Sequence, residues 1–450
     1  MPNSGFTHDS AKLKSLTRDL LDYARERGAT AAEAEVSEGY GQTVTVRLGE
    51  VETIEYNRDK GIGISVYLGQ QRGHASTSDF SAKALRDTVD AALSIARFTA
   101  ADDCAGLADP ELLAREFPEL QLWHSWDLPV ERAIELATAC ENAAFAVDKR
   151  ISNSEGASVS TQESHFVYGN SHGFLAGYPT SRHSISCAVI AGGSEGDSDG
   201  MQRDDWYDVA RDAADLVTPQ SVGKRAAERA LRRLDSRKIA TTQAAVLFEA
   251  PVASSLMSHF VSAVSGGSLY RKSSFLLDTL GKPVFSPNVQ MRDLPHIPKG
   301  LGSGAFDAEG VATQSREVVK DGVVQGYFLG SYSARKLGMR STGNAGGNHN
   351  LILNDTGDDF AALLKKLHRG LLVTELMGQG VNQVTGDYSR GAAGYWVENG
   401  EIAYPVQEIT IAGNLKEIYR GITAIGNDVL RHGSRQCGSI LIEQMTIAGD

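Results

Sequence analysis

The sequence predicts an α+β protein: an α/β N-terminal region, with a mainly antiparallel sheet flanked by helices, then a β-rich, glycine-rich C-terminal domain. Helix-like and strand-like hydrophobic spacings alternate through the first half of the chain. Of the 47 glycines, 24 lie in residues 301–450, and such a segment must turn often. Because 450 residues exceed the ~100–200 of one domain, we expect three regions: α+β 1–100, α+β 101–238 and β-rich 239–450.

The first region is predicted to run helix, strands, helix. Helical spacing is shared by the apolar residues near its start, Leu13, Leu16, Leu20 and Ala24. Period-two alternation then predicts four short strands, at 44–48, 51–56, 61–68 and 72–77. A second helix follows, with an apolar face formed by Leu85, Val89, Ala92 and Ile95.

The central region opens with a proline-containing linker, 100–129, which leads to a predicted helix at 130–147. Strands are predicted at 158–168, 173–178 and 184–190, a mobile polar loop at 192–200, and a helix at about 208–234. The third region begins with helical spacing from Leu256 to Val264 and continues in short strands and tight turns.

Composition excludes several classes of protein. The 44 Lys+Arg against 56 Asp+Glu give a net charge of −12, which argues against direct nucleic-acid binding. No window approaches the ~18 uninterrupted apolar residues of a membrane-spanning helix, and residues 1–10 are too polar for a secretory signal. Four cysteines without a C-x-x-C pair are typical of a reducing compartment, so we expect a cytoplasmic protein.

Residues 169–173 (GNSHG) match G-x-S-x-G, the nucleophile turn of α/β hydrolases, with Ser171 as the candidate nucleophile. That turn requires a strand before the serine and a helix directly after it. Here the following residues, 174–181, contain glycine and proline and alternate like a strand. A hairpin turn between two strands is the favoured interpretation, and a serine hydrolase is the less favoured alternative.

The 11 histidines do not form a zinc motif. No H-E-x-x-H or similar pair occurs, and His165, His172 and His183 flank or follow a turn, so we interpret them as surface or turn residues. Cys437 is a weak candidate for a thiolate ligand, and burial as a small side chain is the favoured interpretation.

Two glycine-rich loops are candidates for peptide binding. Residues 300–304 (GLGSG) and 343–347 (GNAGG) complete neither a P-loop nor a dinucleotide-binding motif. Such loops can present backbone N–H groups to an anion or a peptide carbonyl, or can simply be tight turns. The candidate substrate-binding residues in the second loop are Gly343, Asn344, Gly346 and Gly347.

Three longer segments resemble the TldD/PmbA family, and most closely its PmbA (TldE) branch: 266–276 (GGSLYRKSSFL), 331–347 (SYSARKLGMRSTGNAGG) and 374–413. Residues 49–52 and 169–173 fit the same family, so the resemblance covers nearly all of the chain. It implies a cytosolic zinc-dependent peptidase in which a TldD-type and a PmbA-type subunit form a heterodimer. Implied substrates are short unfolded peptides, antitoxins and peptide-antibiotic precursors, and the name "modulator of DNA gyrase" is read as an indirect consequence.

One departure from the family pattern matters for mechanism. TldD-type members carry H-E-x-x-x-H on a helix, and the corresponding positions here hold Ser258, His259 and Ala263. A C-terminal cysteine also ligates the metal in those members, and Cys437 aligns with it. The resemblance therefore implies no metal in this chain, zinc in the TldD-type partner, and a role in completing the partner's substrate channel. A non-catalytic binding or regulatory module is the alternative.

Overall fold

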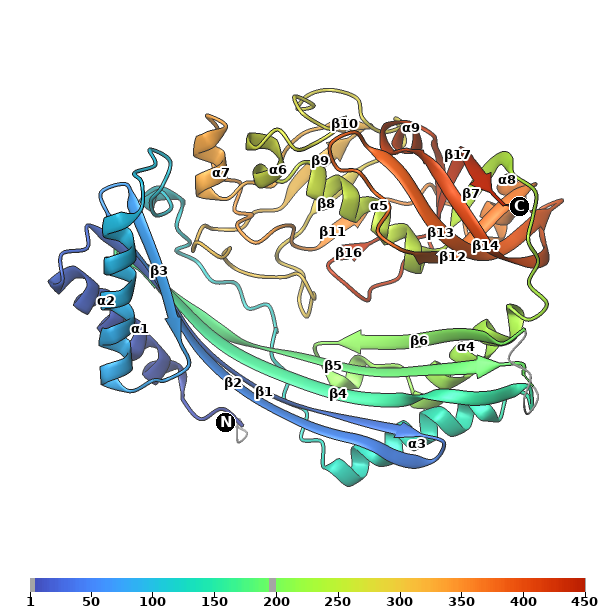
Figure 1. Ribbon diagram of the computed structural model, residues 1–450, viewed down its shortest axis with the longest axis horizontal. Helices are drawn as coiled ribbons and strands as arrows, with labels where there is room; N and C mark the ends of the chain where they lie inside the picture. Colours follow the sequence, from blue (N-terminus) through green and yellow to red (C-terminus); the bar gives the residue numbers. More distant parts are fainter. Residues whose placement is uncertain (1–4, 194–199, 450) are drawn as a thin grey trace.

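The computed structural model describes residues 5–193 and 200–449. A long, curved sheet built from the first half of the chain lies along one side of the molecule, and the C-terminal half lies against one face of it (Figure 1). The predicted α+β class, with antiparallel strands and a strand-rich C-terminal part, is confirmed. The polar loop predicted at 192–200 falls mostly on residues 194–199, outside the described residues.

The long sheet has the strand order β3-β2-β1-β4-β5-β6, and every pairing in it is antiparallel. Residues 1–100 and 101–238 each contribute three of its strands, so both regions share one sheet. Its strands are β1 (Ala31–Arg47), β2 (Glu50–Leu68), β3 (Gln71–Thr77), β4 (Ile151–Asn170), β5 (Leu175–Ala191) and β6 (Gln202–Ala210).

The first two strands are much longer than predicted. β1 is 17 residues and β2 is 19 residues long, whereas the apolar alternation indicated short strands. The alternation is interrupted because the middle of the sheet buries polar residues, among them Glu38, Gln42 and Glu163. Glu163 accepts hydrogen bonds from Trp123 Nε1 at 2.6 Å and Ser125 Oγ at 2.9 Å, which satisfies its carboxylate.

Two pairs of helices pack on the sheet on either side of this polar middle. α1 (Ser10–Glu26) and α2 (Ala82–Phe98) share one apolar core with β1–β3. α3 (Val130–Phe145) and α4 (Pro219–Arg232) share a second core with β1, β4 and β5. The helix predicted at 208–234 is wrong at its start, because residues up to Ala210 belong to β6 and the helix begins only after its cap, Thr218.

The C-terminal half contains two further sheets. A six-stranded sheet has the order β14-β13-β12-β7-β17-β15, and a five-stranded sheet has the order β10-β9-β8-β11-β16. The first comprises β7 (Thr242–Phe248), β12 (Gly370–Met377), β13 (Asp387–Glu398), β14 (Glu401–Asn414), β15 (Ile422–Ile425) and β17 (Ile440–Ala448). The second comprises β8 (Met291–Asp293), β9 (Arg316–Lys320), β10 (Val323–Val324), β11 (Leu351–Leu353) and β16 (Arg435–Gln436).

Short helices complete the C-terminal half, and one large apolar core joins α5 to both of its sheets. The helices are α5 (Ala250–Ala263), α6 (Gly266–Tyr270), α7 (Ser331–Lys336), α8 (Phe360–Leu367) and α9 (Leu415–Arg420). Two 3₁₀ turns, Pro110–Leu112 and Ala213–Asp215, lie in the N-terminal half. None of the helices in the described ranges is long and apolar enough to cross a membrane.

A charge network ties the two halves together. Arg229 on α4 donates from Nε to Asp204 on β6 at 2.9 Å and from Nη1 to Glu249, the residue before α5, at 2.9 Å. The same guanidinium lies 5.4 Å from the centroid of the Trp206 ring. All three charged side chains are at most 18% exposed, so Glu249 depends on this guanidinium for compensation, whereas Asp204 also lies 3.5 Å from Arg233 Nη1.

We predict that Arg229→Ala lowers the free energy of unfolding by about 3 kcal/mol, because it leaves the largely buried Glu249 without its partner and Asp204 with only Arg233, 3.5 Å away. Urea denaturation followed by circular dichroism checks this. The matched control is Lys224→Ala on the same helix, whose 3.8 Å pair with Glu228 is exposed, and it should cost less than about 0.5 kcal/mol. Equal losses for both variants would contradict the prediction.

Candidate functional site

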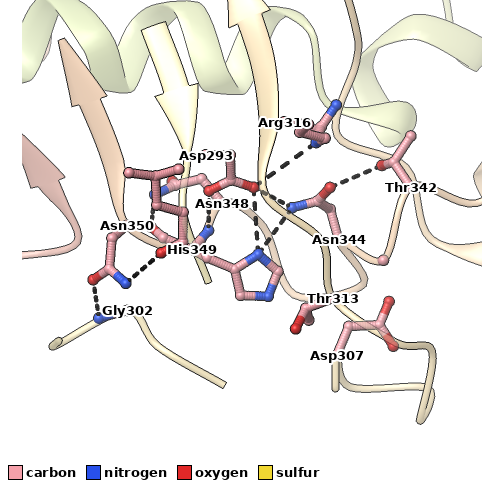
Figure 2. Close-up of polar contacts among 12 residues, drawn as sticks. Asp293, Gly302, Asp307, Thr313, Arg316, Thr342, Asn344, Asn348, His349 and Asn350 are labelled. Carbon is pink, nitrogen blue, oxygen red and sulfur yellow. Dashed lines mark hydrogen bonds and ion pairs between the residues drawn. The ribbon is translucent and has the colours of Figure 1, made fainter. Parts of the chain in front are cut away.

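A buried aspartate at the end of β8 organises the loops of the five-stranded sheet. Asp293 is fully buried, and its Oδ1 accepts a hydrogen bond from the backbone N–H of His349 at 2.8 Å. Its Oδ2 accepts from Asn344 Nδ2 at 2.9 Å and lies 4.0 Å from Arg316 Nε. Figure 2 shows these three residues converging on the carboxylate from separate segments of the chain.

The predicted glycine loop at 343–347 is one of these segments. Asn344 is 4% exposed and donates from Nδ2 to the Gly347 carbonyl at 3.0 Å, so its side chain fastens the loop to itself. Gly343, Gly346 and Gly347 all have positive φ, which favours glycine. At Gly343 a Cβ would also lie 2.7 Å from the Ala312 carbonyl oxygen. Loop geometry accounts for these residues, and their role in peptide binding stays a prediction.

The second glycine loop, 300–304, lies next to the residues that follow the 343–347 loop. Asn350 Oδ1 accepts a hydrogen bond from the Gly302 N–H at 3.0 Å (Figure 2), and its Nδ2 donates to Ser303 Oγ at 2.7 Å. Asn350 follows the 343–347 loop closely in sequence and is fully buried. The two loops therefore belong to one structural unit, which their separation in sequence did not indicate.

A second buried aspartate, Asp307, holds the 343–347 loop from the other side. Its Oδ2 accepts from the Ala345 N–H at 2.9 Å, and its Oδ1 accepts from the N–H groups of Glu309 and Val311 at 2.9 and 3.0 Å. Burial raises the pKa of Asp307 to about 6. Sequence reasoning missed this residue. Asp307 lies two residues before Glu309 and three before Gly310, which has positive φ, and an aspartate followed by such a glycine is typical of an Asx turn.

These loops border a cavity of about 1160 Å³. It lies between the segment 111–118 and the loops 311–316 and 340–343, so both halves of the molecule line it. Gly343 is the one predicted substrate-binding residue on its wall. Arg316 lies on the same wall. Thr313 and His296 lie there too, and Thr313 Oγ1 is hydrogen-bonded to His296 Nε2 at 2.9 Å. The cavity therefore combines apolar surface, charge and backbone from the glycine loop.

The three positions that correspond to the zinc motif lie on α5. Ser258 Oγ donates to the Ser254 carbonyl one turn earlier at 3.1 Å, and Ala263 is buried in the core. The ring of His259 packs edge-on against Tyr388 of β13, with centroids 6.0 Å apart. Burial, followed by the nearby Arg390, lowers the pKa of His259 to about 4, so the imidazole is neutral near pH 7.

The residues around His259 do not fit a metal ion. Serine and alanine replace two of the expected ligand positions, and Cys437 is buried, with the pKa of its thiol raised to about 12 by burial and Asp428. Across residues 5–193 and 200–449, no three His, Cys, Asp or Glu side chains gather as a metal site requires. His259 Nε2 has no hydrogen-bond partner among those residues, and neither has the hydroxyl of Tyr388.

Ser171 lies in a hairpin turn. β4 ends at Asn170 and β5 begins at Leu175, so a strand follows the serine where a hydrolase requires a helix. Ser171 Oγ accepts a hydrogen bond from the Ala32 N–H at 3.0 Å, and its own N–H donates to the Ala32 carbonyl at 2.8 Å. The hydroxyl therefore ties the turn to the start of β1.

The three histidines near this turn have separate partners. His172 Nδ1 lies 3.1 Å from the Ala108 carbonyl oxygen. His183 contacts Thr161 Oγ1 at 2.9 Å and the His124 carbonyl oxygen at 2.8 Å. His165 is buried beneath the N-terminal segment, where its ring lies 5.6 Å from Phe6. His165 and His183 are therefore buried, not surface residues as predicted, because the polar middle of the sheet is covered by residues 5–9 and 121–128.

Family models of PmbA/TldA metallopeptidases match almost the whole chain: domain 1 over residues 32–96, the central domain over 123–234 and the C-terminal domain over 241–449. A protein of Escherichia coli O157:H7 named Metalloprotease PmbA is 51% identical over 93% of this chain and 92% of its own length. A Metalloprotease PmbA homolog of Haemophilus influenzae is 48% identical over 98% and 96%. A Metalloprotease TldD homolog of the same species is 24% identical over 84% and 82%.

Solved structures agree with the sequence matches. Putative modulators of DNA gyrase from Bacteroides thetaiotaomicron and Thermotoga maritima superpose with TM-scores of 0.92 and 0.87, each at 28% identity. They cover 99% and 97% of this chain and all of their own chains. TldE of Thermococcus kodakarensis, at 18% identity and a TM-score of 0.80 over 96% of this chain and all of its own, shares the fold.

We predict that Asp293→Asn lowers the free energy of unfolding by about 2–3 kcal/mol, because three hydrogen bonds, from Asn344 Nδ2, the His349 N–H and His349 Nδ1, lose a buried charged acceptor. Urea denaturation measures the loss. The control is Asp355→Asn in an exposed turn, where the carboxylate accepts one hydrogen bond from Gly357 N–H, and its effect should stay below about 1 kcal/mol. An unchanged stability for Asp293→Asn would show that the loops do not depend on this carboxylate.

A pH prediction follows from His259. Its pKa is lowered in the folded chain to about 4, against about 6.5 in the unfolded chain, so the unfolded state binds more protons between these values. The stability contributed by the neutral ring is present above about pH 6.5 and is lost as pH falls towards about 4. His259→Gln should therefore remove part of the loss of stability between pH 7 and pH 4.5, measured by urea denaturation, whereas the exposed-site control His74→Gln should not.

Proposed function

The chain belongs to the PmbA/TldD metallopeptidase family, and we propose that it is the PmbA-type (TldE-type) subunit of a heterodimeric, zinc-dependent peptidase located in the cytoplasm. Its partner is a TldD-type subunit, which provides the zinc. Its substrates are short unfolded peptides, including antitoxins and peptide-antibiotic precursors. This chain completes the substrate channel and is inactive alone.

The observation that carries this proposal is the combination of a preserved fold with an incomplete metal site. Of the positions on α5 that correspond to the zinc motif, only His259 has a ligand side chain, and its ring packs against Tyr388. The surrounding loops, by contrast, are held by two buried carboxylates with defined hydrogen bonds. A rigid surface without its own metal suits a subunit that serves a neighbour's active site.

The inner face of the long sheet is suited to an extended peptide. Two cavities of about 800 and 610 Å³ lie along β1 and β2 and share Ser37 and Gly61 on their walls. Small side chains leave room for a polypeptide backbone along this face. Charges of both signs line the two cavities, with Glu33 and Arg72 in the larger one, so polar groups of a varied peptide can find partners.

The outer edge of β2 is suited to contact with the partner subunit. β3 pairs only with residues 62–68 of β2, so among the described residues the stretch 50–61 has no strand beside it on that side. An open edge readily accepts a strand from another chain. Val51, Ile54 and Tyr56 on this stretch are 43%, 44% and 67% exposed, which is apolar surface that an obligate interface would bury.

The test is reconstitution. We predict that this chain mixed with a TldD-type subunit carrying H-E-x-x-x-H hydrolyses a short unstructured peptide, whereas each subunit alone does so at least about tenfold more slowly. A chelator should abolish the activity and added zinc should restore it. Hydrolysis by this chain alone at the rate of the mixture would contradict the proposal.

A variant of the β2 edge tests the assembly separately. The double substitution Ile54→Lys, Tyr56→Lys should prevent co-elution of the two subunits in gel filtration, because it places two charges in an apolar contact. The matched control is Phe98→Lys at the end of α2, which is 89% exposed and far along the chain from this edge. Co-elution of both variants with the partner would assign the interface to another surface.

A further inference from the structure

Arg316 carries a guanidinium that makes no hydrogen bond to any residue that the structure describes. Its side chain is 18% exposed, and its Nε and Nη2 atoms are buried without a hydrogen-bond partner in the same residues. The ring of Phe328 lies beneath it, 4.9 Å from the guanidinium carbon. A guanidinium has five N–H donors, and a largely buried one ordinarily spends several of them on acceptors.

Asp293 is the anion nearest to Arg316, but its carboxylate oxygens accept hydrogen bonds from other residues. Its Oδ2 lies 4.0 Å from Arg316 Nε, beyond hydrogen-bond distance, and accepts from Asn344 at 2.9 Å. Its Oδ1 accepts from the His349 N–H. Burial lowers the pKa of Arg316, and the charge of Asp293 opposes that shift without reversing it. The guanidinium is thus balanced in part and retains donors for a second anion.

The guanidinium has space beside it. Arg316 lies on the wall of the cavity of about 1160 Å³ described above. At Gly326 a Cβ would lie 2.7 Å from Arg316 Nη1, so the glycine leaves this atom uncrowded. Two further arginines of the cavity, Arg115 and Arg340, are exposed, and Arg340 pairs loosely with Glu111 at 3.8 Å. A ligand entering past these side chains meets a positive group at depth.

The remainder of the cavity wall combines polar side chains, among them the carboxylates of Glu111 and Glu116, with an apolar part. Phe117 is 51% exposed and packs edge-on against Phe306, with centroids 5.9 Å apart. Leu113 and Val311 lie on the same wall and are buried from solvent. A ligand that fits both features has one anionic group and an apolar portion next to it. A phosphate group, with nearly two charges and three strong acceptor oxygens, would leave this apolar wall unused.

We propose that this cavity binds the C-terminal carboxylate of a short peptide against Arg316, with the last, apolar side chain of the peptide against Phe117. Because Nε and Nη2 of the guanidinium are buried, the carboxylate accepts a charge-assisted hydrogen bond from Nη1. The proposal rests on the proposed function, because it takes a peptide as the ligand. It makes this subunit selective for the free end of a chain, as suits the breakdown of short peptides.

The experiment compares two forms of one probe. A fluorescein-labelled pentapeptide, Gly-Ser-Gly-Ala-Leu, is prepared with a free carboxylate and as the C-terminal amide, and each is titrated with the full chain by fluorescence anisotropy. The free acid should bind at least about tenfold more tightly than the amide. Inorganic phosphate at 10 mM, on the order of its cellular concentration, should displace the free acid by less than about twofold.

Variants assign the preference to Arg316. Arg316→Gln should bind both peptides equally, at the affinity of the amide, whereas the control Arg115→Gln at the exposed rim should keep most of the preference. Should Arg316→Gln fail to fold, Gly326→Ala serves instead, because its Cβ crowds Nη1 and should reduce the preference.

Equal binding of acid and amide by the native chain, a preference that survives Arg316→Gln, or strong displacement by phosphate would each overturn the proposal. Failure of the free-acid peptide to bind would overturn it too. The reconstitution assay decides the proposed function independently, since peptide hydrolysis by the mixture does not require an anchored C-terminus. An active heterodimer without acid preference would therefore reject this inference alone.

Discussion

The position of the loops in the C-terminal half of the site depends on the interactions of one buried carboxylate, that of Asp293. It joins the end of β8, the glycine loop 343–347 and the start of β9 through Asn344, His349 and the charge of Arg316. A carboxylate with no exposure is costly unless such partners surround it, so the three segments are held in place together. The cavity beside them is consequently bordered by loops with a defined position. Its wall includes Gly343, the first residue of that glycine loop.

The N-terminal sheet imposes the second constraint. Its two apolar cores are separated by a polar middle, in which Glu163 is satisfied by Trp123 and Ser125 from the segment that precedes α3. That segment and residues 5–9, which are not helical, cover the centre of the sheet between the two helix pairs. The strands can therefore run uninterrupted past both helix pairs and leave their other face towards the C-terminal half, as Figure 1 shows. The Arg229 network then fixes the two halves at one end.

Much of this fold was predictable where apolar periodicity is strong, as in α1, α2 and α3, and the hairpin at Ser171 followed from the strand-like residues after it. The length of β1 was not, because polar residues in its middle interrupt the pattern on which strand prediction depends. The length of β2 was not either, because its residues 50–60 are exposed on both faces and show no alternation of burial. The helix predicted at about 208–234 includes the last three residues of β6, 208–210, which continue the strand instead. The site was predicted only in part. Gly343 is on the cavity wall, but Asp293 and Arg316 are ordinary charged residues in sequence, and only tertiary structure brings them together.

We propose that this chain provides binding surface and that a TldD-type partner provides the metal. The residues at 258, 259 and 263 carry one imidazole, and that ring is half-buried, neutral near pH 7 and packed on Tyr388. Metal content by plasma mass spectrometry, on the isolated chain and on the reconstituted heterodimer after dialysis, tests the claim most directly. We expect less than about 0.1 zinc ion per isolated chain and about one zinc ion per heterodimer. One tightly held zinc in the isolated chain would contradict it.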